Sequence, residues 1–148
     1  MCAKVHILRL KPGQEVKQCL EDYVVGHAPN GVAIMTCCGS VTSAKLRFAA
    51  DSNGVTDKIQ HYNQNFEVLS MSGTVSKDGA HLHICLGDNN GATIGGHVMG
   101  DLKVFTTMEL ALCESTDVTL KREHDPETGY NELTVTKGID GASPNKND

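Results

Sequence analysis

The sequence predicts an α+β fold, in which one main amphipathic helix packs on a mostly antiparallel β-sheet. Two observations predict this class. Most apolar residues fall in runs with strand-like composition or alternation, and short turns rich in Gly, Asn and Asp separate consecutive runs, which favours antiparallel pairing. Only one segment has clear helical spacing of apolar residues, so we expect a single helix to cover a face of the sheet.

The first predicted strand covers residues 4–10, where side chains alternate between two faces and Pro12-Gly13 ends the run. The predicted helix follows and ends before Pro29. Its apolar residues recur at intervals of three and four, which places them on one face: Val16, Cys19, Leu20, Tyr23 and Val24.

The rest of the chain is expected to form strands joined by short connections. Gly39-Ser40 has the composition of a hairpin turn, and residues 87–91 form a tight reversal. The strands after the helix are expected at residues 31–38, 41–48, 65–76, 81–86, 92–99, 103–114, 118–123 and 130–136. We place one domain at 4–136 and a disordered tail at 137–148, which is rich in Gly, Asn, Asp and Ser.

Composition limits the function classes. The chain has 148 residues, enough for one domain that folds without a structural metal or disulfides, so a metal would serve a function. Its net charge of -5 argues against broad contact with phosphates, and direct DNA binding is not expected. The longest apolar stretch, 31–38, is far shorter than the roughly 20 residues of a membrane span, and no secretory leader is visible. We expect an intracellular, cytoplasmic protein whose cysteines are reduced thiols.

Three histidines are predicted to converge. His81 and His83 share one face of their strand, because side chains alternate. If residues 87–91 form the loop, antiparallel pairing places His97 directly opposite His81 and Gly95 opposite His83. Directly opposed side chains have Cβ atoms about 4.5–5.5 Å apart. A slip of one residue would send His97 to the other face, so convergence depends on the register.

Three neutral imidazoles suit a divalent metal, in particular zinc. Such a site leaves the charge on the ion and keeps a coordination position open, as in catalytic zinc sites. The alternative is that His81, His83 and His97 are simply solvated or packed.

Three charged residues are candidates for roles beside the metal. Glu67 can serve as a fourth ligand, as a hydrogen-bond partner of a ligand or as a general base. The alternative is that Glu67 is a sheet-edge carboxylate that pairs with Arg47 or Lys45. Arg9 and Arg47 are candidates to bind an anion, although charges on strands also serve to discourage aggregation.

A series of short motifs runs along residues 4–136 in one order. They are residues 10–16 (LKPGQEV), Gly39-Ser40 with Leu46-Arg47, residues 66–74 (FEVLSMSGT), His81-Leu82-His83, Gly95-Gly96-His97 and residues 106–109 (TTME). In these motifs the chain resembles the PPC (plants and prokaryotes conserved) domain, also called DUF296.

The resemblance implies a compact α+β domain that assembles as a homotrimer. In land plants the domain follows an AT-hook, an Arg-Gly-Arg-Pro motif that binds the DNA minor groove, and no such motif precedes the domain here. The fold is also similar to that of acetolactate decarboxylase, whose zinc is held by a comparable His-x-His and a later His. This similarity implies a metal at His81, His83 and His97, but the reaction does not follow from the fold.

Two functions from different classes follow. The first is a metal-dependent protein acting on a small carbonyl or carboxylate substrate, with Glu67 handling a proton and Arg47 or Arg9 holding a carboxylate. The second is a module for oligomerisation or protein interaction without chemistry. A DNA-associated role, as in the AT-hook relatives, is a third hypothesis, and the sequence leaves open whether the protein is an enzyme.

Overall fold

A computed structural model describes residues 2–54 and 58–137. The elements are β1 (Ala3–Leu10), α1 (Val16–His27), β2 (Val32–Arg47), β3 (Ile59–Ser76), β4 (Gly79–Gly87), β5 (Thr93–Ser115), β6 (Val118–His124) and β7 (Asn131–Lys137). Five strands form the main sheet in the order β1-β5-β2-β3-β4, and all their pairings are antiparallel. The predicted α+β class is confirmed.

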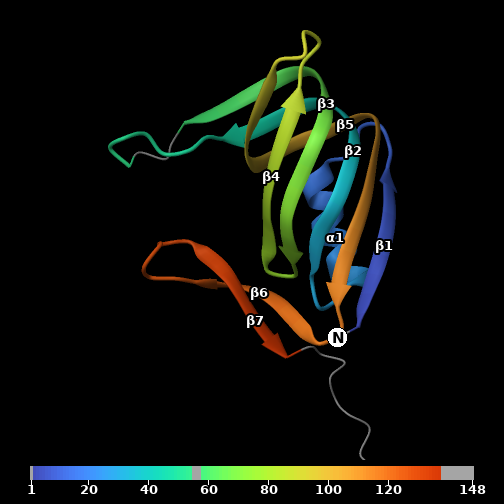
Figure 1. The fold of residues 1–148 in the computed structure, drawn as a ribbon, viewed down its shortest axis with the longest axis vertical. Coiled ribbons are helices and arrows are strands. Elements are labelled where there is room, and N and C mark those ends of the chain that lie inside the picture. The colour runs from blue at the N-terminus through green and yellow to red at the C-terminus, as the bar shows by residue number, and fades with distance from the viewer. Residues whose placement is uncertain (1, 55–57, 138–148) are drawn as a thin grey trace, which may run out of the picture.

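Strand β4, at one edge of the main sheet, also pairs with β5. Residues 93–97 of β5 pair with β4, residues between 97 and 113 pair with β2, and residues 108–115 pair with β1. Figure 1 shows α1 against one face of this sheet and the β6–β7 hairpin set apart as a separate two-stranded arm. β5 therefore connects two regions, since one end carries His97 and the other leads into the arm.

Helix α1 has the predicted amphipathic character. Val16, Leu20 and Val24 are fully buried against the sheet. The Glu15 carboxylate caps the first turn by accepting a hydrogen bond from the Gln18 backbone N–H at 2.6 Å. It also accepts one from the Leu102 backbone N–H at 3.0 Å, so the same side chain joins the start of the helix to β5.

The hairpin predicted at Gly39-Ser40 is wrong, because β2 runs unbroken through both residues. Gly39 pairs with Val68 of β3 and with Met108 of β5. Its φ is +149°, and a Cβ added there would lie 2.1 Å from the Thr107 carbonyl oxygen. The glycine therefore permits a close approach between central strands, where the sequence alone suggested a reversal.

The two strands predicted at 92–99 and 103–114 are likewise one strand, β5. Gly100 and Asp101 have positive φ angles within it, and the pairing with β2 shifts between Ser43 and Lys45. Such irregularities bend a strand without ending it. β3 also begins at Ile59, earlier than the predicted 65.

Three further predictions concern the chain as a whole. All six cysteines are free thiols, and burial raises the pKa of the Cys37 thiol to about 11. Among the described residues, no helix is both long and apolar enough to span a bilayer. β7 includes Lys137, and the disordered tail predicted beyond it falls outside the described residues.

Candidate metal centre

His81 and His83 on β4 and His97 on β5 form one cluster. One ring nitrogen from each lies within 4.8 Å of the other two. The Nε2 atoms of His81 and His83 are 3.1 Å apart, and the three ring centroids are separated by 5.0, 5.0 and 5.4 Å. The predicted convergence of the three histidines is confirmed.

The predicted register of these strands is wrong by two residues. His97 pairs with His83, and Gly95 pairs with Cys85. The loop begins one residue later than expected because Gly87 still pairs with Thr93. A shift of two leaves every side chain on its predicted face, since alternation has a period of two. The three imidazoles therefore meet despite the error.

The Asp88 side chain explains the position of the loop. One of its carboxylate oxygens accepts hydrogen bonds from the backbone N–H groups of Asn90 and Ala92, at 2.8 and 2.9 Å. The Asp88 backbone N–H also donates to the Ala92 carbonyl at 2.9 Å. These contacts hold 88–92 as a closed turn and fix the strands on either side.

The imidazole of His97 is suited to bind a metal. Its Nδ1 is buried and has no hydrogen-bond partner among the described residues. Burial, and then the nearby positive charge of Arg47, lowers the pKa of His97 to about 4. Burial likewise lowers the pKa of His81, followed by the charge of Arg122. At neutral pH the neutral forms of His81 and His97 are therefore favoured, and the neutral imidazole is the form that binds metals.

The spacing of the cluster agrees with a metal bound between the rings. Zinc–nitrogen bonds of about 2.0–2.1 Å in a tetrahedral site imply nitrogens roughly 3.3–3.4 Å apart. The 3.1 Å between the His81 and His83 nitrogens is close to that value. The donor set and the unpartnered Nδ1 of His97 both fit a divalent ion.

Backbone packing at Gly73 holds β4 in position behind the cluster. Gly73 pairs with Leu82, between the two histidines of β4. Its φ is +136°, and a Cβ there would lie 1.9 Å from the His81 carbonyl oxygen. Only glycine fits at this position, so the close contact between β3 and β4 helps to set the position of His81.

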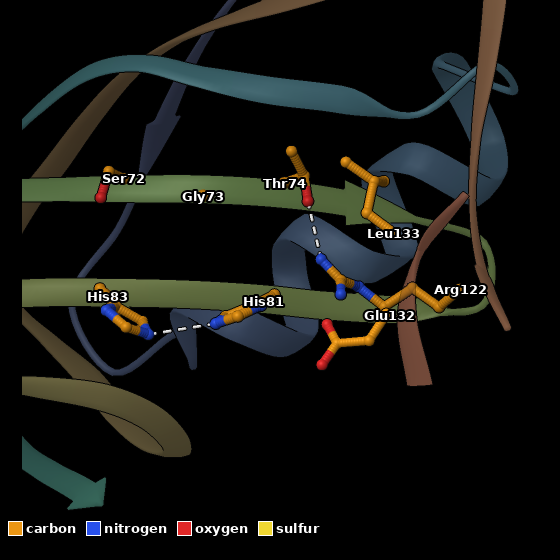
Figure 2. A pocket seen from close by; sticks show the side chains of 8 residues that line it. All are labelled: Ser72, Gly73, Thr74, His81, His83, Arg122, Glu132 and Leu133. Carbon is orange, nitrogen blue, oxygen red and sulfur yellow. Dashed lines mark hydrogen bonds between the residues drawn. The ribbon is translucent and has the colours of Figure 1, made fainter. Parts of the chain in front are cut away.

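Two neighbouring hollows open beside the cluster. The first, about 280 Å³, includes His81, His83, Arg122 and Glu132, and Figure 2 shows these side chains between β4 and the arm. The second, about 310 Å³, includes His81, His97, Arg47 and Tyr130. Residues of the β6–β7 arm and its turn therefore form part of the wall around the histidines.

Sequence reasoning missed Arg122 and Glu132. Arg122 donates a hydrogen bond to the Thr74 hydroxyl at 2.8 Å and a longer one to the Asn131 carbonyl at 3.4 Å, as the side-chain view in Figure 2 partly shows. The bond to Thr74 ties the arm to β3, and the bond to Asn131 lies within the arm. Nothing in the local pattern of residues 118–136 indicates that this hairpin folds back toward β4.

The predicted charged residues are placed differently from one another. Arg47 shares the second hollow with the histidines. Glu67 is exposed and lines a different hollow beside Asp88 and Phe105, and it is not part of the metal cluster. Neither Arg47 nor Lys45 forms an ion pair with Glu67 among the described residues. Arg9 lines a third hollow and donates to the Thr107 hydroxyl at 3.1 Å.

His6, on β1, belongs to a hydrogen-bonded group. Its Nδ1 lies 2.9 Å from the Tyr23 hydroxyl, and its Nε2 lies 3.1 Å from a carboxylate oxygen of Glu114. Glu114 is only 1% exposed and also accepts from the Asn30 backbone N–H at 3.1 Å. The group joins β1, α1 and β5, and it lies outside the metal cluster.

Comparison with known proteins places this geometry in a family. Residues 1–116 match the Plants and Prokaryotes Conserved (PCC) domain. The chain belongs to this family. It is the family called PPC above. The matched residues include all three histidines and end before the β6–β7 arm.

Two curated relatives are longer proteins. The PCC chain is 34% identical over 143 residues to "Bifunctional protein GlmU" of Synechococcus sp. (strain JA-3-3Ab), which covers 95% of this chain and 22% of that protein. It is 30% identical over 106 residues to "AT-hook motif nuclear-localized protein 13" of Arabidopsis thaliana, covering 66% and 23%. The chain thus spans less than a quarter of either relative.

Two solved structures have similar folds. A hypothetical protein from Salmonella enterica has a TM-score of 0.84 and 34% identity, with 92% of the PCC chain and 95% of that chain covered. A metal-containing protein from Archaeoglobus fulgidus has a TM-score of 0.71 and 25% identity, with 88% and 93% covered.

Proposed function

We propose that this PCC-domain protein binds a divalent metal, zinc in particular, through His81, His83 and His97. One observation carries the proposal: three imidazoles lie within ligand distance of one another, and a buried Nδ1 among them has no other partner. The similarity to a metal-containing protein from Archaeoglobus fulgidus supports it.

We further propose that the metal acts on a small carbonyl or carboxylate compound. When bound, a metal with three protein ligands and an open position supplies Lewis-acid polarisation of an oxygen. The chain's own contribution is to keep His81 and His97 neutral and to surround the open position with Arg47, Arg122 and Glu132. Glu67 remains a candidate for proton transfer by sequence reasoning only, since its side chain lines another hollow.

Metal analysis of protein purified without an affinity tag tests the first proposal. We expect about one equivalent of zinc per chain, as for a single closed set of ligands. The His83→Ala variant should no longer retain zinc during dialysis. His61→Ala is the matched control, because His61 is an exposed histidine on β3 and lies outside the cluster.

Two results would contradict metal binding. One is a metal content below roughly a tenth of an equivalent even after incubation with zinc and desalting, where a site of this kind should be filled. The other is equal zinc retention by the His83→Ala variant and by the unchanged protein, which would show that the metal binds at a different site.

We propose that the chain forms a homotrimer through the outer face of its sheet. Large apolar side chains are exposed on three strands of this sheet: Val5 at 58% and Ile7 at 75% on β1, Met35 at 59% on β2, and Phe105 at 44% on β5. Exposed apolar groups of this extent are typical of contact surfaces. Light scattering coupled to size exclusion should report three chains, and Ile7→Asp should lower the mass. Val25→Asp, on the exposed face of α1, should not.

A second candidate function is an interaction module without chemistry, which the same exposed apolar groups favour. A trimer that binds zinc yet converts no 2-oxo or 2-hydroxy acid would support it.

We do not extend the DNA association of the AT-hook relatives to this chain, since its net charge is -5. Duplex DNA should show no salt-dependent binding. A cytoplasmic location is also part of the proposal, supported by six free thiols.

A further inference from the structure

Arg47 lies directly beside the metal cluster. It ends β2, and in the register of β2 and β5 its pairing partner is His97. Side chains of paired residues project to the same face of the sheet. Arg47 and His97 accordingly line the same hollow of about 310 Å³, together with His81. A guanidinium and two candidate ligands therefore face one small volume.

The guanidinium of Arg47 has no polar partner among the described residues. It forms neither a hydrogen bond nor an ion pair there, and its main contact is the ring of Tyr130, whose centroid lies 5.4 Å from Cζ. The other two arginines discussed above are engaged, Arg122 with Thr74 and Arg9 with Thr107. Arg47 thus keeps its donors available beside the cluster, held by an aromatic ring.

The charges of this hollow are balanced before any metal binds. Three cationic side chains, Lys17, Arg47 and Arg122, line it, and so do three anionic ones: Glu21, Asp78 and Glu132. Lys17 and Glu21 lie 3.9 Å apart and offset each other. Since metal-bound imidazoles carry no charge, a bound divalent ion would leave the hollow with a net positive charge. An anion is therefore the ligand that this volume favours.

We propose that Arg47 is the carboxylate-binding residue of the metal pocket and that the ligand is a small organic acid. This inference rests on the proposed metal site. The planar guanidinium can hold a carboxylate through two parallel hydrogen bonds, which an ammonium group cannot. A further oxygen of the ligand would reach the open position of the metal. The same hollow is lined by Met99 and Ala80, which provide apolar contact for a short carbon chain.

The size of the hollow restricts the acid. At about 310 Å³ it lies at the lower end of ligand pockets. Tyr130 is the positioning residue: its ring holds the guanidinium in place and does not itself need to touch the acid. It lies in the connection between β6 and β7, so the arm contributes to recognition beyond the part of the chain that matches the PCC family.

Calorimetric titration of the zinc-loaded protein with pyruvate tests the proposal. Pyruvamide, the uncharged analogue, serves as the second probe. We expect pyruvate to bind and pyruvamide to bind at least about tenfold more weakly, since a charge-assisted pair is lost. Arg47→Gln should weaken pyruvate binding by a similar factor while zinc content stays unchanged. Lys45→Gln, two residues away on the same strand, is the matched control. It should leave both pyruvate binding and zinc content unchanged.

Variants at Tyr130 separate positioning from general structural damage. Tyr130→Phe keeps the ring and should retain pyruvate binding. Tyr130→Leu removes the stacking contact and should weaken binding about two- to fivefold. Equal weakening by Phe and Leu would mean that the ring face does not position Arg47.

The outcomes distinguish this inference from the proposed metal site. If the protein holds no zinc, the proposed function fails and the inference fails with it. If zinc is held but pyruvate and pyruvamide bind alike, or Arg47→Gln and Lys45→Gln behave alike, the metal site stands and the carboxylate assignment is overturned.

Discussion

His97 of β5 lies directly opposite His83 of β4. This pairing places the ring centroid of His97 5.4 Å from that of His83, so a residue from a second strand joins the His-x-His motif. The pairing depends on the backbone contacts around it, which include the close approach of β3 to β4 at Gly73.

Gly73→Ala should destabilise the protein and reduce zinc retention. The substitution places a methyl group where the His81 carbonyl lies, at a φ of +136° that L-residues rarely adopt. We expect a loss of about 1–3 kcal/mol in the free energy of unfolding, measured with urea. Gly26→Ala is the control, because its Cβ meets nothing within 4 Å in helix α1. It should stabilise the helix by about 0.5–1 kcal/mol.

The stability of the metal-free protein should fall as the pH is lowered from about 6.5 toward 4. His97 has an ordinary pKa of 6.5 and a folded pKa of about 4, so the unfolded chain binds a proton first. The contribution of neutral His97 is complete above pH 6.5 and is lost as the pH falls through 4. Urea unfolding with a chelator at several pH values measures this, and His97→Leu should flatten the dependence. A slope in the opposite direction would contradict the burial of His97.

Glu114→Leu should cost about 1–3 kcal/mol of stability, because a buried hydrogen-bonded group loses its partner. The carboxylate accepts from the Asn30 backbone N–H and faces His6, and leucine offers neither group an acceptor. Thermal unfolding compares it with Glu109→Leu, an exposed position on the same strand. Similar melting temperatures for the two variants would show that the buried group does not stabilise the fold.

Glu132 should influence zinc affinity more than Glu67 does. Glu132 lines both histidine hollows, and its charge acts to raise the pKa of His81. Removing this negative charge in Glu132→Gln should weaken zinc binding by roughly two- to tenfold. Glu67→Gln should leave the affinity unchanged, since Glu67 lines a separate hollow. Competition with a chromophoric chelator measures both. A larger loss for Glu67→Gln would restore the role predicted from the sequence.

The interpretation of glycine shows where local patterns mislead. Gly39-Ser40 has the composition of a turn, yet Gly39 lies in the middle of β2 because neighbouring strands approach it on two sides. Composition reports the conformations that a residue allows. It does not report whether another strand lies alongside, which depends on residues far away in the chain.

By itself, the sequence determined the α+β class, the buried face of α1 and the common face of His81 and His83. These features follow from periodicities of 3.6 and 2, which are local and leave a direct pattern of apolar residues. The face of His97 was also predictable, since it needed only the parity of the strand pairing. A register error of two residues did not change it.

Only the tertiary structure decided which charged side chains accompany the histidines. Arg122 and Tyr130 reach the cluster because the β6–β7 arm folds back toward β4, while Glu67 lies in a separate hollow. The pairing of β2 with β5 places Arg47 opposite His97, although residues 48–96 lie between them in the sequence. Such juxtapositions depend on packing between distant segments, and no local periodicity records them.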